Sequence, residues 1–479
     1  MEITIQEIES LAPNAAAAKN GRDLVSKNKY ANLKISEDGT LIWGECAGSG
    51  KNPYYCSADY AEANKPVFRC NCPSRQFPCK HGIGLLYAFQ KGLQFDVAEI
   101  PEDIASKRAK IEKRQEKKEQ EKQDIKEKAA KQSAKPKNTK TIIKKLDAQL
   151  SGIEVAQKLL RNIVQVGLSG IDSATKKTLT AQIKELGNYY IGGIQTAFNN
   201  LLVELDYVEG DEYTSVIDQL NYISALLKKS KEYIEWKKEN PEADPEINSA
   251  IEEQIGFVWK LTDLMQYGLY EENAEILQLS YYSYDNIARK EFVDEGYWFN
   301  LKTGKIYKSK NYRPYRAAKY IKEENSCFEV LQLPELFIYP GDVNPRARWE
   351  SSKFRAATKE DREKVGASAN GNFAEVVKQA KGTIKNPLMD KNPVVLLKLH
   401  KANMQGEHIV IEDKEGNKLT LTDFPGQNIY TETSLKSILP ANCEGLTLMA
   451  MIDNDVKTGE FSITALSLTT PDKIIRLLY

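Results

Sequence analysis

Cysteine, histidine and net charge are all scarce in this chain. Its 479 residues include seven cysteines and three histidines, and 67 Lys and Arg residues balance 67 Asp and Glu residues. A net charge of zero gives the whole chain no electrostatic attraction toward nucleic acid or a membrane surface. Four of the cysteines are scattered without the spacing of a disulfide framework, which predicts a reducing compartment, the cytoplasm.

Long apolar runs, a secretion signal and the usual catalytic motifs are lacking as well. No apolar run approaches the ~18 to 20 residues that a spanning helix needs, so we expect no membrane partner. The first residues are acidic and carry no basic segment, so we expect no signal peptide. A phosphate-binding glycine loop, a serine-nucleophile motif and a paired-carboxylate signature are also missing. We therefore expect a protein that is not an enzyme and has no small-molecule substrate.

The cysteines and histidines that are present gather in one short segment. Four metal-capable side chains lie within residues 70–81, in the pattern Cys-x-Cys-x₆-Cys-x-His. They are Cys70, Cys72, Cys79 and His81. Zn²⁺ takes four tetrahedral sulfur or nitrogen ligands at about 2.0–2.3 Å, and this set supplies them. Side chains two residues apart in an extended segment point the same way, so each pair can grip the ion like a pincer. The sequence therefore predicts a structural Zn²⁺ site.

The residues around these four suit that interpretation. Pro73 and Pro78 favour a turn between the two pairs. Residues 82–92 then have the pattern of a short apolar helix that Gly92 ends. We expect this helix to cover a small core with the side chains of Ile83, Leu86, Tyr87 and Phe89.

Other roles for the four residues explain less. Free cysteines are often buried as small hydrophobes, but that does not account for two matched pairs. Redox cysteines are more often spaced Cys-x-x-Cys, and a catalytic zinc keeps one position open for water. Cys46 and Cys56 could replace one ligand, but they lack a matched pair. We expect both of them in strands.

The arrangement resembles the SWIM-type zinc finger, a family with Cys-x-Cys, a variable gap and Cys-x-His. The resemblance covers residues 30–95. Ahead of the ligands it includes Trp43, Gly44, the turn at 48–51, Tyr54 and Asp59. It implies a small ββα zinc module that contacts nucleic acid or proteins. Bacterial members of this kind are associated with MoxR-type AAA+ ATPases and von Willebrand factor A partners, which favours an adaptor or scaffold with a protein partner.

Nucleic acid stays open as the alternative partner because basic residues surround the predicted finger. They are Lys51, Lys65, Arg69, Arg75 and Lys80. Phosphate contacts from such residues would give salt-dependent binding to DNA or RNA.

The chain as a whole has the pattern of an α+β multidomain protein. We expect a SWIM-like zinc-finger domain at 1–100, a charged helix and linker at 101–140, an antiparallel helical bundle at 141–290, a mixed α/β region at 291–390, and a β-rich barrel or sandwich at 391–479. Within the first domain, the spacing of Ile5, Ile8 and Leu11 predicts a helix. The Asp38-Gly39 dipeptide between two apolar runs predicts a hairpin.

The charged segment at 101–140 has two interpretations. Its lysines and arginines, from Lys107 to Lys118, could form a basic arm for nucleic acid. Interspersed acids dilute that charge and form i,i+4 pairs, so we favour a solvated spacer helix with little face to bury.

Apolar spacing predicts four helices in the bundle. One closes near Gly170, one is capped by Asp172-Ser173 and runs to Leu205, one spans 212–238, and one runs from about Pro245 to Leu264. In the last domain, five strands are expected at 394–400, 408–412, 418–422, 446–452 and 460–466. His400 and His408 have no third ligand near them in sequence, so we expect structural roles for both.

Arginines and aromatic residues occur together in the mixed region. They are Arg313, Arg316, Arg346, Arg348, Arg355 and Arg362, with Tyr312, Tyr315 and Trp349. Such a set can hold phosphate and stack bases, which makes it a second nucleic-acid candidate. We favour an ordinary surface.

Overall fold

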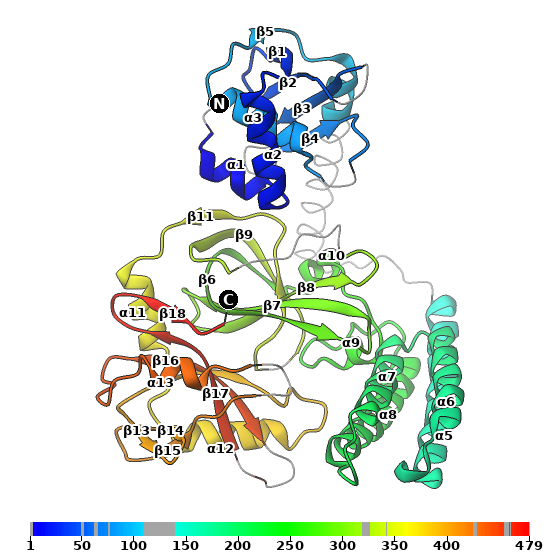
Figure 1. The fold of residues 1–479 in the computed structure, drawn as a ribbon. Coiled ribbons are helices and arrows are strands. Elements are labelled where there is room, and N and C mark those ends of the chain that lie inside the picture. Colours follow the sequence, from blue (N-terminus) through cyan, green and yellow to red (C-terminus); the bar gives the residue numbers. More distant parts are fainter. Residues whose placement is uncertain are drawn as a thin grey trace. The chain divides into compact units, whose positions relative to one another are not determined.

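The chain folds into two compact units, Met1–Asp124 and Ile125–Tyr479. The computed structural model describes residues 3–48, 52–61, 66–74, 77–109, 139–318, 326–341, 343–424, 429–454, 459 and 461–478. The described residues form helices together with one sheet in the first unit and three in the second (Figure 1), so the α+β fold class is confirmed.

The first unit is built on one five-stranded sheet. Its strands are β1 (Tyr30–Ile35), β2 (Leu41–Cys46), β3 (Tyr54–Asp59), β4 (Val67–Cys70) and β5 (Asp96–Val97), in the order β4-β3-β2-β1-β5. The predicted hairpin is confirmed, since β1 and β2 pair antiparallel around Gly39, which has a φ of +65°. The sheet is larger than the small ββα module that the resemblance implies.

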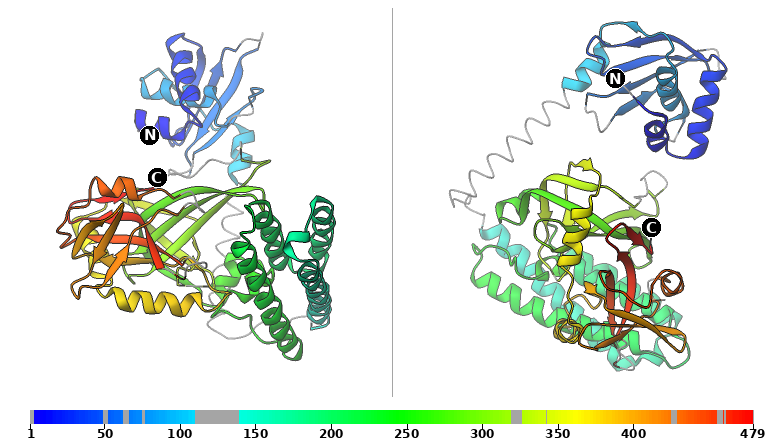
Figure 2. Two further views of the ribbon diagram at one scale, coloured as in Figure 1. Left: turned by 60° about the horizontal axis from the view of Figure 1, so that its bottom comes forward. Right: turned by 90° about the vertical axis from the view of Figure 1, so that its left-hand side faces the viewer.

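Helices cover one face of this sheet. They are α1 (Ile5–Leu11), α2 (Ala15–Ser26) and α3 (Lys80–Gln90), and Figure 2 shows them on the same side of the strands. Side chains alternate along β2, so Ile42 faces these helices and packs with Ile83 and Leu86. The expected core role of α3 is confirmed, although the helix begins at Lys80, two residues earlier than predicted.

The opposite face of the sheet is covered by the start of the charged segment. Residues 102–109 are helical, and Ile104, 1% exposed, packs on Leu41 and Trp43. The Arg108 guanidinium donates to both carboxylate oxygens of Asp59. The expectation of a solvated helix with little face to bury is therefore wrong for residues 102–109, and the rest of the predicted spacer and linker, residues 110–138, lies outside the described residues.

The second unit begins with a helical bundle. Its long helices are α5 (Thr139–Val166), α6 (Ser173–Leu186), α7 (Gly192–Asp206) and α8 (Thr214–Glu239), and they share one apolar core. The helix predicted from 172 to 205 is divided, because Tyr190 adopts a left-handed conformation with a φ of +58°. The fourth predicted helix is also divided, into α9 (Ile251–Ile255) and α10 (Leu261–Gln266), because the chain turns at Gly256 with a φ of +137°.

A curled sheet follows the bundle. Its strands are β6 (Tyr270–Asn286), β7 (Glu291–Asn300), β8 (Ile306–Pro314), β9 (Val330–Ile338), β10 (Ala347–Arg348) and β11 (Lys353–Arg355). The order is β10-β9-β6-β7-β8, and β11 also pairs with β9. A single bridge between Lys308 and Arg346 brings β8 beside β10, so the sheet curls toward closure. Since β6 starts at Tyr270, residues 270–286 are strand where the helical bundle was expected.

Two further sheets complete the chain. One contains β12 (Val394–Lys398), β16 (Thr447–Asn454), β17 (Phe461–Thr469) and β18 (Ile474–Arg476), and the other contains β13 (Lys401–Gln405), β14 (His408–Glu412) and β15 (Lys418–Thr420). The two sheets share a core with α12 (Phe373–Ile384). The other face of β12, β16 and β17 packs on β6 and β7. All five predicted strands are confirmed, and β13 and β18 were not predicted.

Within the described residues, no helix combines the length and the apolar character that crossing a bilayer requires.

Candidate metal centre

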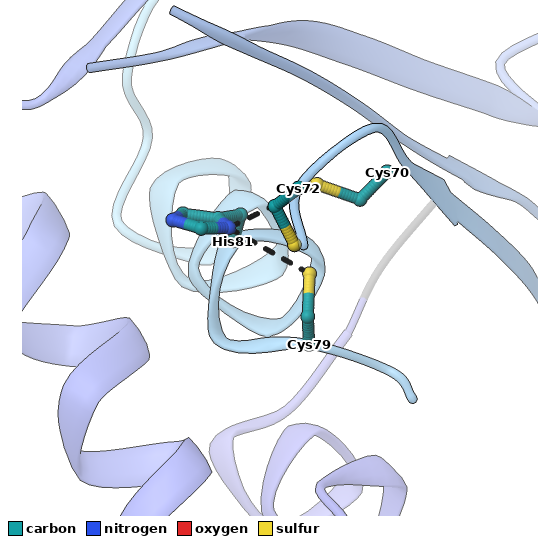
Figure 3. Close-up of side chains that lie close together, drawn as sticks. All are labelled: Cys70, Cys72, Cys79 and His81. Carbon is teal, nitrogen blue, oxygen red and sulfur yellow. Dashed lines mark hydrogen bonds between the residues drawn. The ribbon is translucent and has the colours of Figure 1, made fainter. Parts of the chain in front are cut away.

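The four predicted ligands come together at the junction of β4 and α3. Cys70 ends β4, and Cys72 follows it by two residues. Cys79 occupies the N-cap position of α3, and His81 lies in the first helical turn. Figure 3 shows their side chains converging. The prediction that both members of the second pair lie in an extended segment is wrong, because only Cys79 is extended and His81 is already helical.

The geometry suits one ion. The four ligand atoms all lie within 4.8 Å of one another. His81 Nδ1 lies 3.8 Å from Cys70 Sγ and 3.8 Å from Cys79 Sγ. A tetrahedral ion with bonds of about 2.0–2.3 Å places neighbouring ligand atoms roughly 3.3–3.8 Å apart. Small side-chain rotations would therefore bring all four atoms to a metal ion, and this set can bind one.

The surroundings hold the imidazole and keep water from it. Cys79 is 2% exposed and His81 is 4% exposed. The ring of Tyr54 lies on the His81 ring, with 4.8 Å between the centroids. The Tyr30 hydroxyl donates a hydrogen bond of 2.8 Å to the His81 carbonyl oxygen, which ties the first turn of α3 to β1.

The electrostatics of the cluster favour a cation. A hydrogen bond from the Cys70 thiol lowers the pKa of Cys79 to about 3, and the same contact raises the pKa of Cys70. Burial raises the pKa of Cys72. Sulfurs this close cannot all carry negative charge unless a positive ion lies among them. The N-terminus of α3 adds a partial positive charge beside Cys79.

Cys46 and Cys56 are not part of the cluster. Both are fully buried strand residues, as predicted, on β2 and β3. The Cys56 thiol approaches the Gly44 carbonyl oxygen at 3.5 Å, and burial raises its pKa well above the ordinary value. Four protein ligands fill the tetrahedral coordination of Zn²⁺, which suits a structural ion rather than a catalytic one.

Helix α3 is held in position by a close crossing with α2, which the sequence analysis did not predict. A Cβ on Gly84 would lie 2.1 Å from Tyr30 Oη and 2.9 Å from the Gly21 carbonyl oxygen. Gly21 and Gly84 therefore let α2 approach the turn that carries His81. The signal available in the sequence was Gly82-Ile83-Gly84 inside an otherwise apolar helix, because glycine in a helix often marks close backbone approach.

Two of the five basic residues proposed for nucleic-acid binding, Arg69 and Lys80, lie within the described residues. Lys51, Lys65 and Arg75 lie outside the described residues. Arg69 donates to Asp59 at 3.1 Å and is largely buried there. Lys80 is exposed next to His81.

The structure brings together only part of the arginine and aromatic set of the mixed region, since Tyr312, Arg346, Arg348 and Trp349 line one cavity. Arg313 is buried in an ion pair with Asp294, and Arg355 bridges Glu275 and Asp361. Arg348 is exposed. His400 and His408, for which structural roles were expected, each lie near a carboxylate: His400 lies 3.5 Å from Glu444 and His408 lies 3.2 Å from Glu432.

Comparison with known proteins adds little. No family model matches the chain, and no curated protein matches it. Among solved structures, a murine DNA-binding protein bound to double-stranded DNA is similar at 10% identity, over 43% of this chain and 96% of that chain. The TM-score of 0.18 is too low for this likeness to bear on fold or function.

Proposed function

We propose that the chain is a non-enzymatic zinc-binding interaction protein, an adaptor or scaffold of the cytoplasm, with Cys70, Cys72, Cys79 and His81 as the ligands of a structural Zn²⁺. The observation that carries this proposal is the convergence of four ligand atoms within 4.8 Å at the end of β4 and the start of α3. Three thiolates and one imidazole are the donor set that zinc takes in closed structural sites. The ion would clamp the sheet to the helix that covers it.

The kind of partner follows from the resemblance to SWIM-type zinc fingers. That resemblance supports a protein partner, in particular a MoxR-type AAA+ ATPase working with a von Willebrand factor A protein. Unit Ile125–Tyr479, with its bundle and three sheets, is large enough to provide the partner-specific surface.

Metal analysis of ligand variants tests the zinc centre. The full chain is expected to hold one zinc ion, and Cys72→Ser and His81→Ala are each expected to release it and to unfold Met1–Asp124. The helical circular dichroism of the bundle should remain. Cys327→Ser, in the second unit and outside the cluster, is the matched control and should keep its zinc. Unchanged zinc in both ligand variants would refute the assignment.

Nucleic-acid binding through the finger is the second candidate. The exposed ammonium of Lys80 beside the cluster is the described feature that favours it. A gel shift with a random duplex and a random single strand, repeated across a salt series, tests it because phosphate contacts weaken steeply with salt. Binding at low salt that Lys80→Glu weakens would support this function, and absence of binding at low salt would eliminate it.

A further inference from the structure

The curled sheet of the second unit has an incompletely closed seam. Its outer strands, β8 and β10, meet at one parallel bridge, where the Lys308 amide donates to the Pro345 carbonyl oxygen at 3.1 Å. In the part of the chain that the structure describes, β8 makes no other pairing along this edge. Beyond Lys308, β8 and residues 347–349 form the two walls of a slot.

The free edge of β8 presents a row of backbone groups to this slot. The pairing of β7 with β8 is regular from Glu291 opposite Pro314 to Phe299 opposite Ile306. Amide directions alternate along a strand, so Lys310 and Tyr312 direct their amides and carbonyls the same way as Lys308, away from β7. Among the described residues, neither amide meets an acceptor across the seam. An open strand edge of this kind is a template for another strand.

The slot has room for an added segment. Its cavity is about 470 Å³, and its lining comes from β8 and from the segment around β10: Ser309, Lys310, Asn311, Tyr312, Tyr339, Arg346, Ala347, Arg348 and Trp349. Trp349 packs edge-on against Trp298, with 5.1 Å between the ring centroids. The slot therefore offers an apolar wall beside the hydrogen-bonding edge.

The charge of the slot is positive. Its lining includes two arginines and one lysine, and no carboxylate. Glu295 neutralises Lys310 at 2.9 Å, and Arg346 is shared between Glu253 at 2.8 Å and the face of Tyr339. Arg348 is exposed, and no acid of the described residues lies within ion-pair distance of it. An incoming segment with acidic side chains would complement this uncompensated charge.

We propose that an extended acidic peptide segment of a partner protein binds in this slot and adds to β8 as a further strand. Its backbone would pair with the outward groups of Lys310 and Tyr312, and its acidic side chains would face Arg348. The alternating donors and acceptors of a strand edge match a peptide backbone, whereas phosphates would leave the carbonyls without a partner. This inference adds a partner chemistry to the interaction role proposed above. The slot lies in Ile125–Tyr479 and the metal cluster lies in Met1–Asp124, so either proposal can fail alone.

Peptide binding to the full chain tests the proposal. The probe is a fluorescein-labelled octapeptide of alternating Glu and Val, followed by fluorescence anisotropy, with the Lys and Val counterpart as the charge control. Tyr312→Pro removes the outward amide without touching the pairing to β7, and Tyr312→Ala controls for loss of the ring. We expect the proline variant to bind about fivefold more weakly than the alanine variant, the effect of one lost hydrogen bond.

A variant that reverses the charge of Arg348 provides the second test of the proposal. Arg348→Glu should weaken the acidic peptide about five- to tenfold, and Lys353→Glu, an exposed residue on β11 outside the slot, should leave it unchanged. Bound peptide should also slow hydrogen exchange of residues 306–314. Absence of binding at millimolar peptide would overturn the proposal, as would equal binding by the two Tyr312 variants. Displacement of the peptide from the slot by a thymidine 20-mer, with tighter binding of the oligonucleotide, would assign the slot to nucleic acid instead.

Discussion

Tyr30 links strand β1 to the helical turn that carries the ligand His81. Its hydroxyl donates to the His81 carbonyl oxygen at 2.8 Å. We predict that Tyr30→Phe destabilises the first unit by about 1 kcal/mol, the usual net value of one such hydrogen bond, and weakens zinc binding severalfold. Urea unfolding and zinc competition with a chromophoric chelator would measure both. Tyr55→Phe is the control, since this tyrosine of β3 is 38% exposed. Unchanged stability and zinc affinity in Tyr30→Phe would contradict the assigned role.

The four ligands could be predicted from the sequence, but the residues that hold them in place could not. The four ligands lie within residues 70–81, so their spacing is visible in the sequence itself. Tyr30 lies 51 residues from His81, and no local pattern connects them. Tyr54 was noted only as part of a family resemblance, whereas the structure places its ring on the imidazole. Contacts of this kind depend on how the strands and α3 pack, which propensity and periodicity do not specify.

The crossing of α2 and α3 depends on two glycines. We predict that Gly84→Ala destabilises the first unit by roughly 1–3 kcal/mol, because the added methyl group meets the Tyr30 hydroxyl and the Gly21 backbone. This cost outweighs the ~1 kcal/mol that alanine gains over glycine in a helix. The measurement is urea unfolding followed by tryptophan fluorescence, to which the first unit contributes through Trp43 and the second unit through its four tryptophans.

Gly382→Ala supplies the matched control for this helix prediction. Gly382 lies within α12, and nothing lies within 4 Å of the position of its added Cβ. Alanine there should stabilise the second unit by up to ~1 kcal/mol. If Gly84→Ala behaved like Gly382→Ala, the close crossing would not be a constraint on the fold.

Arg355 joins three elements of the second unit. Its guanidinium on β11 donates to both oxygens of Glu275 on β6 and of Asp361 on α11 (Lys359–Ala367). These hydrogen bonds lower the pKa of Glu275 to about 2 and that of Asp361 to about 2. Both carboxyls have a lower pKa in the folded chain than in the unfolded one, so their stabilisation is complete above about pH 5 and is lost as the pH falls toward 2.

A pH series on one variant tests this connection. Arg355→Gln should destabilise the second unit by roughly 2–4 kcal/mol at pH 7, because two partly buried carboxylates lose their partner. The difference from wild type should shrink as the pH falls from 5 to 2. Urea midpoints across that range provide the measurement, and Lys353→Gln on the same strand serves as the control. A difference that stays constant down to pH 2 would show that Arg355 acts by packing alone.

At the scale of elements, sequence patterns predicted which helices and strands exist better than they predicted where each one begins and ends. The β1–β2 hairpin, α5 and α8 were predicted because local turn chemistry and a sustained apolar stripe specify them. The division of the predicted helix 172–205 at Tyr190 was not predicted, because a left-handed tyrosine arises from packing and has no local sequence signal. Residues 270–286 were placed within the expected helical bundle, although they form strand β6. The middle of this strand, residues 276–282, is buried, and periodicity alone does not distinguish a short buried strand from a buried helix.

Across the whole molecule, contacts between distant residues join the second unit together. The Arg476 guanidinium donates to the Gln278 carbonyl oxygen, 198 positions away. The Gln254 amide donates to the Leu388 carbonyl oxygen, 134 positions away. Together with the core that β6 and β7 share with β12, β16 and β17, these contacts connect the bundle, the curled sheet and the C-terminal sheets. The second unit should therefore unfold cooperatively.

The two units are expected to respond differently to metal removal. Structural zinc contributes about 10 kcal/mol or more of binding free energy in small domains, comparable to the whole stability of a domain. A strong zinc chelator should therefore abolish the unfolding transition of Met1–Asp124 and leave that of Ile125–Tyr479 at its original midpoint. Differential scanning calorimetry of the full chain measures both transitions, and the transition that Cys72→Ser lacks is that of the first unit. The chelator should have no further effect on Cys72→Ser. If both transitions fell together on chelation, the ion would support more of the fold than the junction of β4 and α3.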